Sequence, residues 1–133
     1  MSEAGQRSAI DILVVDDDTI MRDLMTDWLE AAGYTVRKVS DCRAASGACP
    51  EAPPALVISD MWMPGPCGAE AIRTLRARHP QLQLIAVSGH FGSGLGCSAQ
   101  EALAAGAARA FPKPVKRAEL LAAVAELIGP PAK

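Results

Sequence analysis

The chain has 133 residues, half of them hydrophobic, which suits a single domain with one packed core, and only 4% are aromatic, so the core is expected to be mostly aliphatic. The formal net charge of −2 and the lack of a basic block argue against direct binding of nucleic acid. The apolar runs are too short to cross a bilayer and the first residues lack the apolar core of a signal peptide, so we expect a cytoplasmic protein without membrane contact.

Cysteines offer no sign of a metal centre or a disulfide framework. They lie far apart, form no Cys-x-x-Cys pair and have no histidine nearby, at positions Cys42, Cys49, Cys67 and Cys97. We expect reduced thiols without a metal or disulfide role.

The first third of the chain predicts a strand, a helix and a second strand. Residues 1–8 are polar and expected to be disordered, and the apolar run over 10–15 predicts a strand that leads into three aspartates. Residues 19–32 predict a helix that ends at Gly33, and 34–39 predict the next strand. The apolar residues of this helix recur on one face, and they are Ile20, Met21, Leu24, Met25, Trp28 and Leu29.

The middle of the chain predicts a buried strand that ends in a carboxylate. A weak helix over 41–49 is stopped by prolines, and the apolar run from Leu56 leads straight into Asp60, which a Pro-Gly turn follows. A third helix is predicted over 68–79, before Pro80. The fourth strand, over 82–87, leads to a serine, Ser88.

The last third begins with a flexible loop, since residues 89–96 hold four of the eleven glycines. A short alanine-rich helix over 98–105 and a strand over 109–112 follow, and Lys113 comes directly after that strand. A last amphipathic helix is predicted over 117–128, with a tail at 130–133 and no linker to a second domain. Its inward residues are predicted to be Leu120, Leu121, Val124, Leu127 and Ile128.

Strand and helix alternate five times, which predicts an α/β fold with a (βα)5 doubly wound, five-stranded parallel sheet and helices on both faces. In such a sheet the carboxyl ends of all strands share one edge, where ligands bind. Five polar residues from four distant segments follow predicted strands and should meet there: Asp16, Asp17, Asp60, Ser88 and Lys113.

These residue types together favour phosphoryl chemistry. Crowded carboxylates repel one another by several kcal/mol at low effective dielectric, so they stay ionised only around a cation. Oxygen ligands favour a hard divalent ion, and Mg2+ is the usual one. A carboxylate can attack phosphorus and carry the group as an acyl phosphate, while Lys113 suits a phosphoryl oxygen and Ser88 offers a hydroxyl.

At this point the chain resembles a stand-alone response-regulator receiver domain of the CheY-like family. The resemblance covers about residues 10–128 and rests on four motifs in the right order: Val14-Val15-Asp16-Asp17-Asp18, Ser59-Asp60-Met61-Trp62-Met63-Pro64-Gly65, Val87-Ser88-Gly89, and Gly106-Ala107 with Pro112-Lys113-Pro114. It implies a flavodoxin-like three-layer sandwich over 9–129 and a signalling domain rather than an enzyme. A cis Lys113-Pro114 bond is common in the family.

The resemblance also implies a role for each site residue. Asp60 would accept a phosphoryl group from a histidine kinase or a histidine phosphotransfer protein, and Ser88 and Lys113 would contact that group. Asp17, Asp60 and the backbone carbonyl of Trp62 would bind Mg2+ directly, and Asp16 would act mainly through water. The downstream protein target is not identified by the sequence, and a homodimer is left open.

The chain departs from the family in its switch region. The switch aromatic of the family lies three residues before the lysine, where this chain has Ala110, and Phe111 is one place later. Because side chains alternate along a strand, Phe111 should face the opposite side and belong to the core. Two smaller departures are the glycine-rich segment after Ser88 and a bulky residue at Trp62.

Two other readings stay open at this stage. A haloacid-dehalogenase-type phosphatase also uses an aspartate nucleophile and Mg2+, and Asp16-Asp17-Asp18-Thr19-Ile20 nearly matches its signature, but no aspartate follows Asp60 to supply its later acidic pair. The altered switch region motivates the other reading, an interaction domain of the same fold that works without phosphorylation.

Overall fold

The computed structural model describes residues 11–16, 18–39, 54–60, 82–89 and 99–130, together with Arg73, Ala77 and Pro80. Predictions for residues 1–8, for the helix over 41–49, for the loop after Gly89 and for all four cysteines fall outside this part of the chain. Of the helix predicted over 68–79, Arg73 and Ala77 are described, and both are helical.

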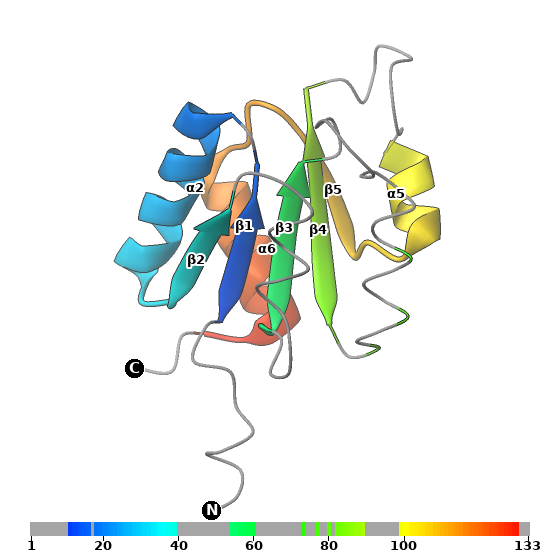
Figure 1. The fold of residues 1–133 in the computed structure, drawn as a ribbon. Coiled ribbons are helices and arrows are strands. Elements are labelled where there is room, and N and C mark those ends of the chain that lie inside the picture. The colour runs from blue at the N-terminus through cyan, green and yellow to red at the C-terminus, as the bar shows by residue number, and fades with distance from the viewer. Residues whose placement is uncertain are drawn as a thin grey trace, which may run out of the picture.

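The described strands form one parallel sheet, as predicted, with the order β2-β1-β3-β4-β5 (Figure 1). They are β1 (Ile12–Val15), β2 (Val36–Val39), β3 (Leu56–Asp60), β4 (Gln83–Ser88) and β5 (Arg109–Pro112). The strand order reverses at β1, so the carboxyl ends of β1 and β3 flank the topological switch point. Sheets of this kind bind ligands at that crevice.

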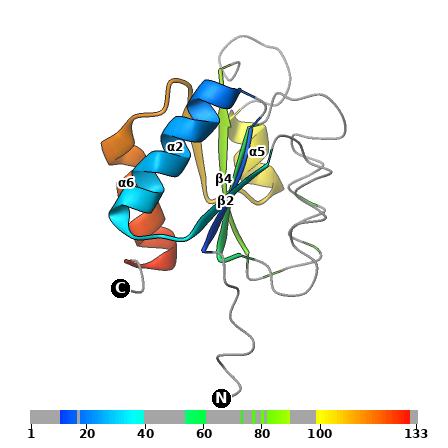
Figure 2. The same ribbon diagram turned by 60° about the vertical axis from the view of Figure 1, so that its left-hand side comes forward.

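Helices lie on both faces of the sheet, which is the predicted layered, doubly wound arrangement. In Figure 2 the sheet is seen nearly edge-on, with α2 (Thr19–Ala32) and α6 (Arg117–Ile128) on one side and α5 (Ala99–Ala105) on the other. None of the helices described is long and apolar enough to cross a membrane.

Two core clusters fill the space between the sheet and the helices. Ile12 and Val14 point into the cluster beneath α2 and α6, whereas Leu13 and Val15 point into the cluster on the α5 side. All four are essentially fully buried. Continuous apolar strands of this kind are typical of a parallel sheet covered on both faces.

The bounds of α2 match the prediction because both of its ends have strong local signals. Asp18 is the N-cap, and its Oδ1 accepts a hydrogen bond from the backbone N–H of Met21 at 3.3 Å. Gly33 ends the helix with a φ of 112°, a left-handed conformation that glycine adopts without strain.

The predicted inward face of α2 was too wide. Met21, Met25 and Leu29 are buried as expected, but Ile20 is 75% exposed and Leu24 is 42% exposed. The helix packs against the sheet and α6 along a narrower stripe than its apolar residues cover, so periodicity alone overestimated its buried face.

Two strands begin later than predicted because polar residues hold the chain before them. Asp11 exchanges hydrogen bonds with Thr35 at 2.9 and 3.0 Å, and β1 starts at Ile12. Tyr34 is buried and its hydroxyl donates to the carbonyl oxygen of Gly129 at 2.7 Å, so β2 starts at Val36. The fourth strand is shifted by one residue, α5 is described from Ala99 on, and β5 and α6 have the predicted bounds.

Candidate functional site

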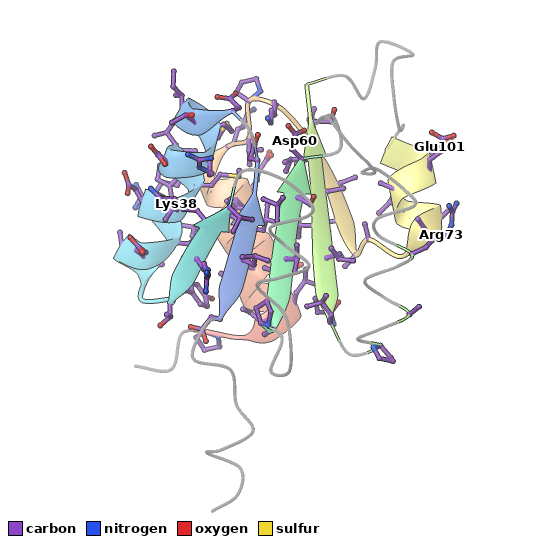
Figure 3. The ribbon with its side chains drawn as sticks, viewed as in Figure 1. Lys38, Asp60, Arg73 and Glu101 are labelled. Carbon is purple, nitrogen blue, oxygen red and sulfur yellow. The ribbon has the colours of Figure 1, made fainter. Side chains whose placement is uncertain are left out.

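Two aspartates lie side by side at the carboxyl edge of the sheet. Asp16 directly follows β1 and Asp60 is the last residue of β3, and these two strands pair with Val15 opposite Ser59. Figure 3 shows Asp60 at this edge, near the end of the arrow of β3. Asp16 is 0% exposed and Asp60 is 3% exposed, so two carboxylates are buried at the switch point.

Lys113 reaches these carboxylates from the end of β5, the outermost strand next to β4. Its Nζ lies 3.0 and 3.1 Å from the two carboxylate oxygens of Asp16 and 3.2 Å from Oδ2 of Asp60. The backbone N–H of Lys113 donates to the carbonyl oxygen of Ser88 at 2.9 Å, which ties the lysine to the end of β4. The bond from Lys113 to Pro114 is cis, as the resemblance implied.

The ammonium of Lys113 is held in its charged form. Burial alone would lower the pKa of Lys113, but hydrogen bonds and charge interactions with Asp16 and Asp60 outweigh burial, so the pKa lies above its ordinary value of 10.5. The lysine is therefore a fixed positive charge between two buried carboxylates across the physiological pH range.

Ser88 ends β4 at the same edge and is 1% exposed. Its strand is the direct neighbour of β3, with Asp60 opposite Val87. Four of the predicted residues, Asp16, Asp60, Ser88 and Lys113, thus come together at one edge of the sheet. Asp17 and Trp62 lie outside the part of the chain that the structure describes.

The described part of this edge suits a hard cation. Oδ2 of Asp16 is buried and has no hydrogen-bond partner there, although Nζ of Lys113 is near it at 3.0 Å. A buried carboxylate oxygen with unused acceptor capacity is a ligand that Mg2+ favours. The described residues contain no group of three acidic, histidine or cysteine side chains that would by itself hold a metal, so the predicted ligand set needs Asp17.

Sequence reasoning missed two contributors to this edge. Oδ2 of Asp18 lies 3.9 Å from Nζ of Lys113, so the N-cap of α2 also adds negative charge beside the lysine. Nη1 of Arg22 donates to the backbone oxygen of Asp16 at 3.2 Å. Asp18 belongs to the acidic run that the sequence analysis singled out. The contact of Arg22 with the backbone of Asp16 could not be predicted from the helical pattern of apolar residues.

The switch region follows the predicted alternation of β5. Ala110 packs against the cluster on the α5 side, and Phe111 packs against the opposite cluster, beneath α6. Phe111 is therefore part of the core on the far side from Ala110, as expected, and the α5 side of β5 has no aromatic ring at this position.

Comparison with known proteins identifies the relatives of this fold. The family model described as the response regulator receiver domain matches residues 12–125. The transcriptional regulatory protein FixJ of Bradyrhizobium diazoefficiens is 32% identical over 117 residues, which cover 88% of this chain and 56% of FixJ. The response regulator protein FleR of Pseudomonas aeruginosa is also 32% identical over 117 residues, but they make up 24% of its length. The chain thus spans about half or less of the length of these relatives.

Solved structures of receiver domains have the same fold as this chain. The receiver domain of NtrX from Brucella abortus superposes with a TM-score of 0.80 at 31% identity, covering 89% of this chain and 98% of that one. A CheY-like receiver domain protein from Methanospirillum hungatei gives a TM-score of 0.79 at 28% identity, covering 90% and 93%.

Proposed function

Since the chain belongs to the response regulator receiver domain family, we propose that Asp60 accepts a phosphoryl group from a phosphohistidine on a histidine kinase or a histidine phosphotransfer protein. One observation carries the proposal: the buried carboxylate of Asp60 lies 3.2 Å from a lysine ammonium at the switch point of the sheet. A nucleophile and a cation for the transferred group are therefore adjacent.

The transfer requires little of the protein besides position and charge. A carboxylate oxygen of Asp60 attacks phosphorus, the bond from phosphorus to the imidazole nitrogen breaks, and its electron pair stays on the imidazole. Lys113 would bind an oxygen of the phosphoryl group, and the hydroxyl of Ser88 would donate to another. Such positioning and charge neutralisation account for most catalysis of phosphoryl transfer.

We assign the Mg2+ site to Asp17, Asp60 and the backbone carbonyl of Trp62 as direct ligands, with Asp16 acting mainly through water. The buried Oδ2 of Asp16, which among the described residues faces only the ammonium of Lys113 at 3.0 Å, supports this assignment, as does the all-oxygen ligand set. When bound, the ion would neutralise the carboxylates and the incoming phosphoryl oxygens. Asp16 and Asp60 would orient it, and Lys113 would give up part of its contact with them.

We infer a signalling domain that acts by protein contact, rather than a metabolic enzyme. Its relatives FixJ and FleR are named as regulators and are longer than this chain. The output of this chain would therefore pass through a surface recognised by a further protein, through a further part of its own polypeptide or through a second copy. We assign this surface to residues 88–115, which include β5 and the end of β4.

Mass spectrometry after treatment with acetyl phosphate and Mg2+ tests the proposal. The wild-type protein should gain one alkali-labile phosphoryl group, and Asp60→Asn should not. Asp27→Asn is the matched control, because Asp27 is an exposed aspartate of α2 and has no place at the site. A phosphoryl group that persists in Asp60→Asn would remove Asp60 from this role.

Two further outcomes distinguish the two other functions. Failure of the wild-type protein to accept phosphate from any small donor, with the fold intact, would favour an interaction domain that works without phosphorylation. Repeated turnover of a generic phosphate ester would instead favour a phosphatase of the haloacid-dehalogenase type.

A further inference from the structure

Arg22 of α2 folds back over the turn that joins β1 to α2. We propose that Arg22 is a positioning residue for the acidic site: its guanidinium fixes the backbone of Asp16 and thereby the direction in which Asp16 presents its carboxylate toward Mg2+. The proposal rests on the proposed function, because it concerns the metal site of that function.

The contacts of Arg22 point to the turn and not to an ion pair. Nη1 donates to the backbone oxygen of Asp16 at 3.2 Å, and the side chain is only 18% exposed. The nearest ion-pair partner described is Asp23, at 3.9 Å from Nε, but Asp23 accepts a hydrogen bond from Lys38 at 2.8 Å. Nε of Arg22 is buried and has no hydrogen-bond partner among the described residues.

A long cationic side chain has little reason to be mostly withdrawn from water in this way for stability alone. Arginine is mostly exposed in proteins, and a buried N–H without a partner costs free energy. An exposed conformation of Arg22 would leave both its guanidinium and the carbonyl of Asp16 to water. The observed conformation instead pairs Nη1 of Arg22 with the carbonyl of Asp16, next to the backbone bond from the N–H of Arg22 to the oxygen of Asp18 at 2.9 Å.

The turn is thus held at both of its described aspartates. The N–H of Asp18 donates to Oδ1 of Asp16 at 2.9 Å, which fixes the carboxylate, while Arg22 fixes the carbonyl of the same residue. Hydrogen bonds that orient the residues around a metal ion tune its affinity, and their loss typically weakens binding by about 10- to 100-fold. The bond from Arg22 to the carbonyl of Asp16 is of this kind.

Charge and position make opposite predictions, so the sign of the effect decides between them. If Arg22 were only a positive charge near the site, its removal would tighten Mg2+ binding, because like charges repel. If it positions the turn, its removal weakens binding although a repulsive charge is lost. Arg22→Lys keeps the charge but loses the planar group that reaches the carbonyl, so it also weakens binding.

Calorimetric titration of the phosphate-free protein with Mg2+ tests this. We expect Arg22→Gln and Arg22→Lys to weaken binding roughly tenfold, while Arg37→Gln, at an exposed arginine of β2, leaves it unchanged. Unchanged or tighter binding in Arg22→Gln, or unaltered binding in Arg22→Lys, would overturn the proposal. Thermal unfolding of each variant shows that the titrated protein is folded.

Hydrogen exchange of the Asp18 amide supplies a readout that needs neither Mg2+ nor phosphorylation. This amide donates to Asp16, so without Mg2+ it should exchange faster in both Arg22 variants than in the wild type, while the amides of the sheet stay unchanged. Equal exchange of the Asp18 amide in variants and wild type would contradict the positioning role. If the wild-type protein binds no Mg2+, the proposed function fails, and this exchange still decides the role of Arg22.

Discussion

Replacing Lys113 with alanine should tighten Mg2+ binding while it impairs phosphorylation. Nζ of Lys113 lies 3.0 to 3.2 Å from carboxylate oxygens of Asp16 and Asp60. A divalent ion that enters between them must displace at least one of these charge-assisted bonds, each worth roughly 1.5–3 kcal/mol. Since about 1.4 kcal/mol is a factor of ten in affinity, we expect Lys113→Ala to bind Mg2+ about tenfold more tightly or better.

The same substitution should make the metal-free protein less stable in a pH-dependent way. Loss of the ammonium removes the positive charge that pairs with the buried carboxylates of Asp16 and Asp60. We therefore expect the free energy of unfolding at neutral pH to fall by roughly 1–3 kcal/mol. The pKa of Lys113 is raised in the folded protein, so its stabilising contribution is fully present below the ordinary value of 10.5 and is lost as pH rises through the higher folded value. The wild-type and variant stabilities should therefore converge only at strongly alkaline pH.

Calorimetric Mg2+ titration, urea unfolding and the rate of phosphorylation by acetyl phosphate measure the three effects. Lys38→Ala is the matched control, because Lys38 also forms a short ion pair, with Asp23 at 2.8 Å, but on the exposed side of α2 and β2 (Figure 3). The control should change neither Mg2+ affinity nor phosphorylation. Weaker Mg2+ binding in Lys113→Ala would refute the view that the lysine competes with the ion.

The remaining predictions concern three other parts of the molecule. Asp17→Ala should abolish measurable Mg2+ binding by calorimetry, because it removes a charged ligand; binding equal to wild type would exclude that role. Tyr34→Phe should lower the free energy of unfolding by about 1 kcal/mol in urea titrations, since it deletes the hydroxyl that donates to Gly129, and an unchanged stability would show that this bond contributes nothing net. Beryllofluoride with Mg2+ should change hydrogen exchange in the segment between β4 and β5, which begins after Ser88. Changes confined to Asp16, Asp17 and Asp60 would show that the signal takes another route.

The parallel sheet and the meeting of the site residues could be predicted because local signals in the sequence located the strands. Apolar runs bounded by turn residues located the strands, and the helix from Thr19 to Ala32 was correct to the residue because Asp18 caps one end and Gly33 the other. Parallel topology then required Asp16, Asp60, Ser88 and Lys113 to share an edge, although up to 97 positions separate them in the chain.

Features that depend on three-dimensional reach could not be predicted in this way. Ile20 and Leu24 fit the apolar period of α2 but lie beyond the stripe that the sheet and α6 cover. Arg22 belongs by pattern to the polar face of that helix, yet its side chain returns to the backbone of Asp16. Strand starts at Ile12 and Val36 depend on the pairing of Asp11 with Thr35 and on the burial of Tyr34.

The small side chains by which α5 packs against the sheet point to a route by which a signal leaves the site without an aromatic switch. The side chains that α5 contributes to the core are alanines, Ala102 and Ala105, and its one large apolar residue, Leu103, is 46% exposed. Because stabilisation by burial scales with apolar area, these contacts with the described residues stabilise the position of α5 less than bulkier side chains would.

The strands beside α5 connect it to the acidic site. Ser88 ends the strand before it, and the carbonyl of Ser88 accepts the N–H of Lys113, whose ammonium reaches Asp60. A change at Asp60 therefore acts on the ends of both β4 and β5, which flank α5 in the chain. Small side chains at Ala102 and Ala110 leave no bulky ring for the helix to pass. A helix held by small side chains between two strands that end at the site is a candidate for the two-state element that a switch requires, and this route does not depend on a ring at Ala110.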